Sequence, residues 1–323
     1  MEENSIIASA ASTRRKPWLG VGVSGHWTDY REALEAAGMD FTVHAYDAKV
    51  ELMDDPDLEV VRYERVPDVQ VNVRVDDNKI MGCVSDRYSI IQNHEAFALL
   101  EPFTQAGGVI EHAGYTEQGL MFMVLHIRNE SMLGDDFSFD VMCCNSFNGA
   151  FPLSLMMVPT RIICQNMYRK LMGGNSDALL KVRHSSLAKP RLAAASSATG
   201  NVLGYIAAFD HTLQFANTKQ LSKIGVEEIL LPKLFPYPKE GGEREATFRA
   251  KVDALREDFM DRYYDAEDNR KYHEKALGFI NAYYDYLSHH DPTKNMPGSW
   301  DDRRLSGLVS GTDVKSNLIK QVL

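Results

Sequence analysis

The side chains best suited to chemistry gather between Arg161 and Arg191. This stretch holds seven basic residues and one acidic residue, Asp177, a balance of +6 in a chain whose formal net charge is −10. Lysine and arginine can follow a phosphate backbone, and a nearby aromatic ring can stack on a base. The candidate nucleic-acid-binding residues are Arg161, Arg169, Lys170, Lys181, Arg183, His184, Lys189 and Arg191, with Tyr168 as a stacking residue.

The same cations have a second explanation inside the protein. Residues 1–59 contain twelve acidic and five basic residues, a balance of −7. This acidic segment can neutralise the basic stretch within one fold or across an interface between copies of the chain. Both explanations remain open at the level of sequence, and a homo-oligomer is one of the expected states.

A cysteine nucleophile is the main catalytic alternative. Cys164 would attack, and His184 or His112 would act as the base that activates the thiol. We predict instead that Cys164 is packed in the interior, because Ile162 and Ile163 flank it and free cysteine is among the most buried residue types.

No other pattern points to a catalytic, metal or cofactor site. The sequence lacks a P-loop, an H-E-x-x-H motif and the cysteine spacing of a zinc site. Cys143 and Cys144 are expected to stay reduced, because adjacent residues of a strand point to opposite faces. We expect no metal and no cofactor, and the sequence favours a non-catalytic protein while an enzyme remains a third hypothesis.

The elements that position these residues begin with strands. Apolar residues alternate with polar ones over 69–75, and a turn at 76–78 leads into a strand at 79–84, which predicts a hairpin. Further strands are predicted over 41–46, 109–115, 120–127, 137–145 and 153–158, whereas residues 20–25 read as a loop. The pattern predicts an antiparallel sheet with helices packed on one face.

Helical spacing dominates the second half of the chain. Helices are predicted over 93–105, from 159 to about 171, and over 187–221, 226–234, 243–274, 276–289 and 312–323, with a breaker cluster at 235–242. We therefore expect a disordered tail at 1–13, an α+β body at 14–186 and a helical region at 187–323. The fold class is α+β, an antiparallel sheet with packed helices followed by a mainly helical C-terminal region.

Several short motifs resemble one known family. They are Lys16-Pro17-Trp18, Val84-Ser85-Asp86-Arg87-Tyr88, Pro159-Thr160-Arg161-Ile162-Ile163-Cys164-Gln165-Asn166, Arg183-His184 and Asn281-Ala282. Together they resemble the phage and plasmid proteins of domain-of-unknown-function family 932, over nearly the whole chain from about Arg14. The resemblance implies a mobile-element origin and a place in the cytoplasm of the host bacterium, and it implies no established reaction. Family members often carry Ser-His-Asp-Gly-Ser where this chain has Ser146-Phe147-Asn148-Gly149-Ala150, so a role for that His-Asp pair does not carry over.

Two functions follow as hypotheses. The first is a non-catalytic protein that binds single-stranded nucleic acid, for instance in strand annealing or recombination of a phage or plasmid. The second is a protein-interaction module, such as a regulatory or counter-defence factor, that binds a protein partner. No apolar stretch approaches the roughly 20 residues of a membrane span, so a cytoplasmic protein without a membrane partner is expected.

Overall fold

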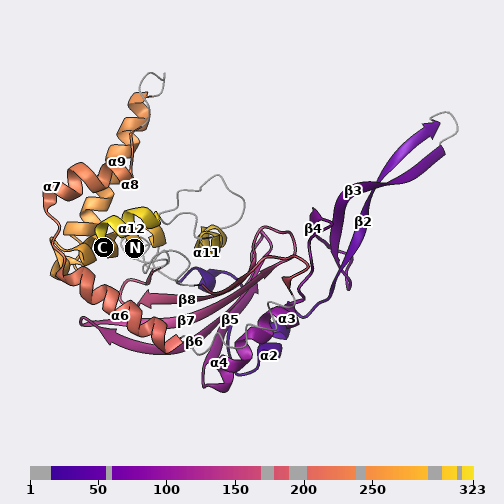
Figure 1. Ribbon diagram of the computed structural model, residues 1–323, viewed down its shortest axis with the longest axis horizontal. Coiled ribbons are helices and arrows are strands. Elements are labelled where there is room, and N and C mark those ends of the chain that lie inside the picture. Colours follow the sequence, from indigo (N-terminus) through magenta and orange to yellow (C-terminus); the bar gives the residue numbers. More distant parts are fainter. Residues whose placement is uncertain are drawn as a thin grey trace, which may run out of the picture.

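A seven-stranded antiparallel sheet forms the centre of the protein (Figure 1). The computed structural model describes residues 16–55, 60–168, 178–188, 202–237, 245–289, 300–310 and 315–323. Within these residues the fold is α+β, as the sequence predicts, and the helices lie mostly in the C-terminal region.

The central sheet is a meander with further strands at both edges. Neighbouring strands follow the order β1-β5-β6-β7-β8-β10, and β9 pairs with β8. Gly119 and Gly134 have positive φ angles of 77° and 73°, which glycine adopts without strain in the turns before β6 and β7. The strands are β1 (Val23–Trp27), β5 (Val109–Tyr115), β6 (Leu120–Met132), β7 (Asp135–Ser146), β8 (Leu153–Arg161), β9 (Asn166–Met167) and β10 (Ala178–Val182).

Each face of this sheet carries its own apolar core, because successive side chains of a strand point in opposite directions. On β6, Met121 belongs to the larger core and Leu120 to the smaller one. Cys143 and Cys144 on β7 divide in the same way, and both are free thiols. The prediction that these two cysteines do not pair is therefore confirmed.

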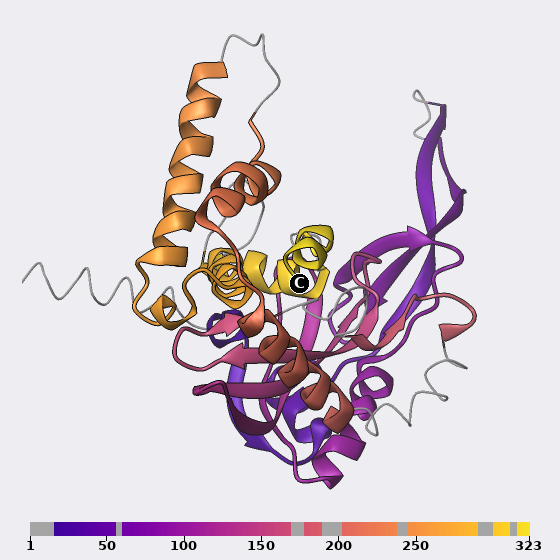
Figure 2. The ribbon, with the colours of Figure 1, turned by 60° about the vertical axis from the view of Figure 1, so that its left-hand side comes forward.

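Helices cover the larger core. In the N-terminal half they are α2 (Tyr30–Ala36), α3 (Asn93–Phe97), η2 (Ala98–Leu100) and α4 (Glu101–Gln105). In the C-terminal half they are α6 (Val202–Thr218), α7 (Lys223–Gly225), η4 (Val226–Leu230), α8 (Leu231–Leu234), α9 (Glu245–Tyr264), η5 (Arg270–Tyr272), α10 (Ala276–His289) and α12 (Ser316–Val322). Helix α6 crosses the strands (Figure 2), and its Phe209 ring packs edge-on against Phe137 and Phe139, with centroid distances of 5.5 Å to each.

The opposite face of the sheet is covered as well. η1 (Pro17–Gly20) and α11 (Trp300–Ser310) supply Trp18, Leu305 and Leu308 to the smaller core. The sequence predicted helices packed on one face, and the structure adds η1 and α11 on the other. The sequence did not predict helix α11, because two aspartates and two arginines follow its first residue and interrupt the apolar spacing.

A second sheet of three strands extends away from the body (Figure 1). Its strands, in the order β2-β3-β4, are β2 (Val43–Asp55), β3 (Val60–Arg74) and β4 (Ile80–Ser85). The predicted hairpin at 69–84 is present and consists of the C-terminal part of β3 paired with β4. Strands β2 and β3 continue beyond it as a two-stranded ribbon, and we call its residues 49–53 and 61–65 the arm.

One predicted helix in the basic stretch is wrong. Residues expected to form a helix from 159 to about 171 instead end β8 at Arg161, turn, and enter the short strand β9. The turn requires a φ of 56° at Gln165, a left-handed conformation that an interior helical residue does not adopt. The predicted loop at 20–25 is also corrected, because Val23–Trp27 pairs with β5 as strand β1.

Arg161 joins the sheet to the helical region. Its guanidinium is 3.0 Å from a carboxylate oxygen of Asp135 on β7 and 2.8 Å from one of Asp268, between α9 and η5. It also donates a hydrogen bond of 2.6 Å to the Asp268 carbonyl oxygen. The side chain is 1% exposed, so these contacts replace the water that it loses on folding.

Truncation of Arg161 should therefore destabilise the protein strongly. Arg161→Ala leaves Asp135 and Asp268 without their shared cation, and we expect the free energy of unfolding to fall by about 3–5 kcal/mol in urea titrations. Arg128→Ala, which removes an exposed arginine of β6, is the control and should cost less than about 1 kcal/mol. A loss of similar size in both variants would contradict the proposed role of Arg161.

Candidate functional site

Two of the predicted nucleic-acid-binding residues lie in the interior. Arg161 is held by its carboxylate partners, and Tyr168 is fully buried with its hydroxyl donating to Asn281 Oδ1 at 2.7 Å. The Tyr168 ring also lies 4.8 Å from that of Tyr284, centroid to centroid. A buried ring cannot stack on a base, so the sequence expectation for these two residues is corrected.

His184 is partly buried and packs against an aromatic ring. Its ring stacks on Tyr88 at a centroid distance of 4.7 Å, and Nδ1 lies 3.3 Å from the Ser89 carbonyl oxygen. Burial lowers the pKa of His184 below its ordinary value, which favours the neutral ring. The Nε2 atom has no hydrogen-bond partner among the described residues. His184 therefore packs the end of β10 against the segment that follows β4.

Two of the predicted cations remain at the surface. Lys181, near the end of β10, and Arg183, just after it, are both exposed. Arg87, which the sequence analysis did not select, is exposed beside Tyr88, the ring on which His184 stacks. The other predicted cations, Arg169, Lys170, Lys189 and Arg191, lie outside the described residues.

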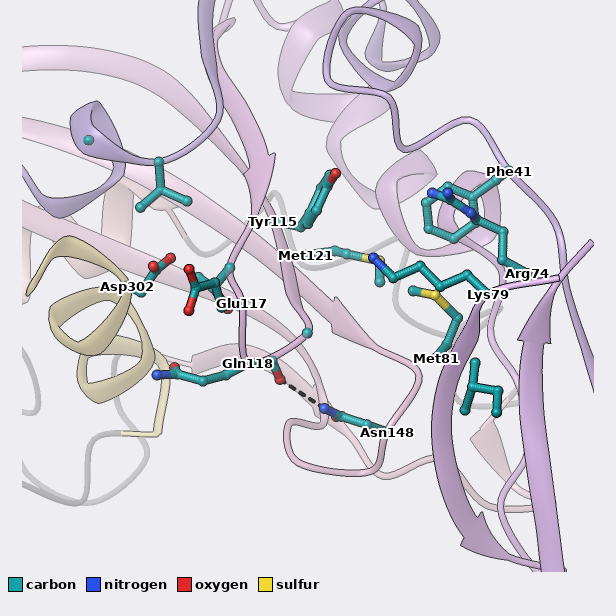
Figure 3. A pocket seen from close by; sticks show the side chains of 15 residues that line it. Phe41, Arg74, Lys79, Met81, Tyr115, Glu117, Gln118, Met121, Asn148 and Asp302 are labelled. Carbon is teal, nitrogen blue, oxygen red and sulfur yellow. Dashed lines mark hydrogen bonds between the residues drawn. The ribbon is translucent and has the colours of Figure 1, made fainter. Parts of the chain in front are cut away.

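A pocket of about 570 Å³ opens where the three-stranded sheet meets the central sheet (Figure 3). Pockets of roughly 300–1,000 Å³ accommodate small molecules and single units of polymers. The turn between β3 and β4, the turn between β5 and β6, and helix α11 all contribute to the lining. Its polar and aromatic residues are Phe41, Arg74, Lys79, Tyr115, Thr116, Glu117, Gln118, Asn148 and Asp302.

The pocket carries cations at one end. Lys79 reaches into it in Figure 3, and no ion pair involving its ammonium group is seen among the described residues. Arg74 lies over the ring of Phe41, 5.1 Å from its centroid, and is paired with Asp77. The hydrogen bond from Arg74 lowers the pKa of Asp77 to about 2, so that carboxylate stays ionised. Lys79 is therefore the cation available to a bound anion.

Carboxylates occupy the other end. Figure 3 shows Glu117 and Asp302 there, away from Lys79. Glu117 is exposed on the β5–β6 turn, whereas Asp302 is buried in α11. Met121 lies between the charged ends, and Met81 lies beside Lys79 (Figure 3). The pocket can thus bind a ligand that has an anionic group, an apolar middle and hydrogen-bond donors at the far side.

Asn148 fixes the floor of the pocket. Its Nδ2 donates to the Gln118 carbonyl oxygen at 2.8 Å, and its Oδ1 accepts from the Ala150 amide at 3.0 Å. A Cβ at Gly82 would lie 2.5 Å from Asn148 Cα, and one at Gly119 would lie 2.8 Å from Nδ2. Glycine is required at 82 because the backbone of Asn148 approaches β4 so closely, and at 119 because the β5–β6 turn has a positive φ there.

The sequence carries no pattern that predicts this pocket. Its lining residues come from segments far apart in the chain, and no motif connects them. At the position where the sequence departs from Ser-His-Asp-Gly-Ser, Asn148 lines the pocket and Phe147 is buried.

A second polar cluster lies on β6 and β7 and does not have the geometry of a catalytic triad. The Asp140 carboxylate, 1% exposed, accepts hydrogen bonds from Lys16 and from Ser138, the latter at 3.0 Å. His126 Nδ1 lies 3.0 Å from Asp140 and 3.4 Å from Ser138 Oγ. In a triad, opposite nitrogens of the imidazole contact the acid and the nucleophile, whereas here one nitrogen faces both. The cluster therefore neutralises a buried carboxylate.

No group of three metal-ligating side chains occurs among the described residues. None of the described helices has the length and apolar character needed to cross a membrane.

Comparison with known proteins places this fold in a family. The model of a domain of unknown function, DUF932, matches residues 80–307. The chain belongs to the DUF932 family. Comparison with curated proteins finds no match, and comparison with solved structures finds none either. The DUF932 span runs from β4 into α11, so it includes Asn148 and Asp302 of the pocket, while Arg74, Lys79 and the arm precede it.

Thiol reactivity tests whether Cys164 can act as a nucleophile. Cys164 is 3% exposed although Ile162 and Ile163 beside it are exposed, and burial raises its pKa to about 12. Because the thiolate is the reactive form, a thiol reagent added to native protein should modify Cys83, the exposed cysteine, and leave Cys164 intact. Peptide mass mapping after short exposure gives the readout, with Cys83→Ser as the control. Rapid modification of Cys164 in that variant would contradict the prediction.

The pH dependence of stability tests the cluster on β6 and β7. The hydrogen bond with Asp140 raises the pKa of His126 above its ordinary value of 6.5, despite partial burial and the nearby charge of Lys16. A raised pKa in the folded state stabilises the protein fully below 6.5, and this stabilisation is lost as the pH rises through the folded-state pKa. Urea titrations at pH values from below 6.5 upward measure the free energy of unfolding. As the pH rises, this free energy should fall less for His126→Gln than for the wild type. His44→Gln, at an exposed position of β2, should behave like the wild type, and identical pH profiles for all three would contradict the assignment.

Proposed function

We propose that this protein binds single-stranded nucleic acid without catalysing a reaction. The observation that carries the proposal is the pocket at the junction of the two sheets, where Lys79 lies beside aromatic and apolar side chains. A single nucleotide unit fits this chemistry, since it presents a phosphate to Lys79 and a flat base to Tyr115, which is 49% exposed. The amino groups of a base can donate to the carboxylates at the far end.

Further cations support a path along β4. This strand begins just after Lys79 and ends at Ser85, a span of about 20 Å at the usual rise per residue. Arg87 follows the end of the strand, and Arg183 precedes His184, whose ring stacks on Tyr88. Both arginines are exposed, as is Lys181 on β10. A strand of nucleic acid that follows β4 would therefore meet positive charge at both ends. Each phosphate contact releases counterions from the nucleic acid, so such binding is sensitive to salt.

Annealing or recombination of a mobile element is the specific role that we propose. The support is architectural: a meander of antiparallel strands with a helix across it is also found in phage single-strand annealing proteins, which is an analogy of fold alone. An origin in a phage or plasmid and a place in the cytoplasm of the host belong to the same proposal.

The proposal predicts parallel losses of affinity at both ends of β4. Lys79→Ala and Arg183→Ala should each weaken binding to every single-stranded sequence by a similar factor, and each should lower the salt slope by about 0.7 if one phosphate contact is lost. Fluorescence anisotropy with a labelled oligonucleotide over a range of salt concentrations measures both quantities. Lys223→Ala, which removes an exposed lysine of α7, is the control and should leave the slope unchanged.

Absence of binding at low salt, for DNA and RNA alike, would reject the proposal. The second candidate, a protein-interaction module, would then take its place. One observation favours it: the arm exposes large apolar side chains, among them Met53 at 60% and Tyr63 at 64% exposure.

A further inference from the structure

The arm is an unusually exposed pair of strands. Its residues pair in register from Lys49 with Arg65 to Met53 with Val61, and no third strand joins them in the described part of the chain. Figure 1 shows it reaching beyond the rest of the molecule. A two-stranded ribbon is marginally stable by itself, and additional strands stabilise it. The arm therefore has the properties of a surface that gains from a partner.

The outer edge of β3 is the part that another strand can reach. Strand β4 pairs with β3 only between Val69 and Val73. From Val61 to Val66, the edge of β3 that faces away from β2 has no strand partner among the described residues. Unpaired backbone N–H and C=O groups along such an edge can form hydrogen bonds with a further strand.

The sequence of this edge is complementary to itself. Around Tyr63 it has Arg62 on one side and Glu64 on the other. If a second copy pairs antiparallel with the two Tyr63 residues opposite each other, Arg62 lies opposite the partner's Glu64, and Glu64 lies opposite the partner's Arg62. Opposite charges directly across an antiparallel pair are stabilising, and like charges are destabilising. A shift of the register by two residues places Arg62 opposite the partner's Arg62 or Glu64 opposite the partner's Glu64.

We propose that two copies of this chain associate through the outer edges of β3, antiparallel and centred on Tyr63. The result is a continuous sheet in the order β2-β3-β3-β2, built on a twofold axis with the same surface on both chains. Arg62 and Glu64, now 3.5 Å apart on one strand, exchange partners across the axis. The aromatic rings of Tyr63 from the two copies meet at the centre.

The charges of the arm are mixed. Its residues include Lys49, Arg62 and Arg65 against Glu51 and Glu64. Such a surface is not the uniformly basic one that follows a phosphate backbone, whereas the alternation of Arg62 and Glu64 suits a copy of the same chain. The inference is thus independent of the proposed nucleic-acid site.

A disulfide at the twofold axis tests the arrangement. In an antiparallel pair the opposed Cα atoms are about 4.5–5.5 Å apart, which lies within the range that a disulfide spans. Tyr63→Cys in a Cys83→Ser background should form a covalent dimer rapidly on mild oxidation. Val61→Cys on the same edge is the matched control, because each Val61 lies opposite the partner's Arg65 and about 13 Å along the strand from the partner's Val61.

Charge reversal supplies the second test, read by sedimentation velocity. Arg62→Glu should weaken self-association at least about tenfold by placing like charges across the axis, as should Glu64→Arg, and the double reversal should restore it. Circular dichroism confirms that each variant is folded. Equal oxidation rates for Tyr63→Cys and Val61→Cys would overturn the proposal, and so would a wild-type protein that stays monomeric at high concentration.

Discussion

The buried guanidinium of Arg161 is the contact on which the arrangement of this protein depends. It ends a central strand of the sheet and is held between Asp135 of the same sheet and Asp268 of the helical region. Burial alone would raise the pKa of Asp135, but hydrogen bonds from Arg161, Lys271 and Tyr272 hold it below its usual range. A charge in the interior is tolerated only with such partners. Because Arg161 contacts both Asp135 and Asp268, it connects the second half of the chain to the first.

Further hydrogen bonds near Arg161 extend the same junction. Tyr168 donates to Asn281 on α10, and Asn281 donates to Asn269 Oδ1 at 3.1 Å. Asn269 in turn donates to the Gly278 carbonyl oxygen at 2.9 Å. His289, at the end of α10, lies 3.0 Å from the Cys164 carbonyl oxygen. The motifs that resemble the DUF932 family in this part of the chain therefore hold the helices to the sheet, and the pocket is built elsewhere.

With its interior tied in this way, the protein presents its distinctive surfaces at the three-stranded sheet. The pocket lies where that sheet meets the turn between β5 and β6, and the arm lies at its far end. The two surfaces differ in form, since the pocket is a cavity lined by Lys79 and Arg74, while the arm is a strand edge with the exposed side chains of Met53 and Tyr63. A molecule that associates through its arms would carry two pockets, one on each copy, and could hold two segments of a strand.

Periodicity in the sequence determined most of the elements. The strand-like run over 109–115 predicted β5 with its observed bounds, and the aromatic-rich helical stretch over 276–289 predicted α10 equally well, because such patterns are a local property of the sequence. Where polar residues are buried the prediction was wrong: the sequence assigned Arg161 and Tyr168 to a ligand surface, but the tertiary structure encloses both. The pocket was likewise invisible, since Lys79, Asn148 and Asp302 meet only after folding. The residue type of a cation or an aromatic ring does not show whether the side chain is buried or exposed. Only the positions of partners that are distant in the sequence decide this.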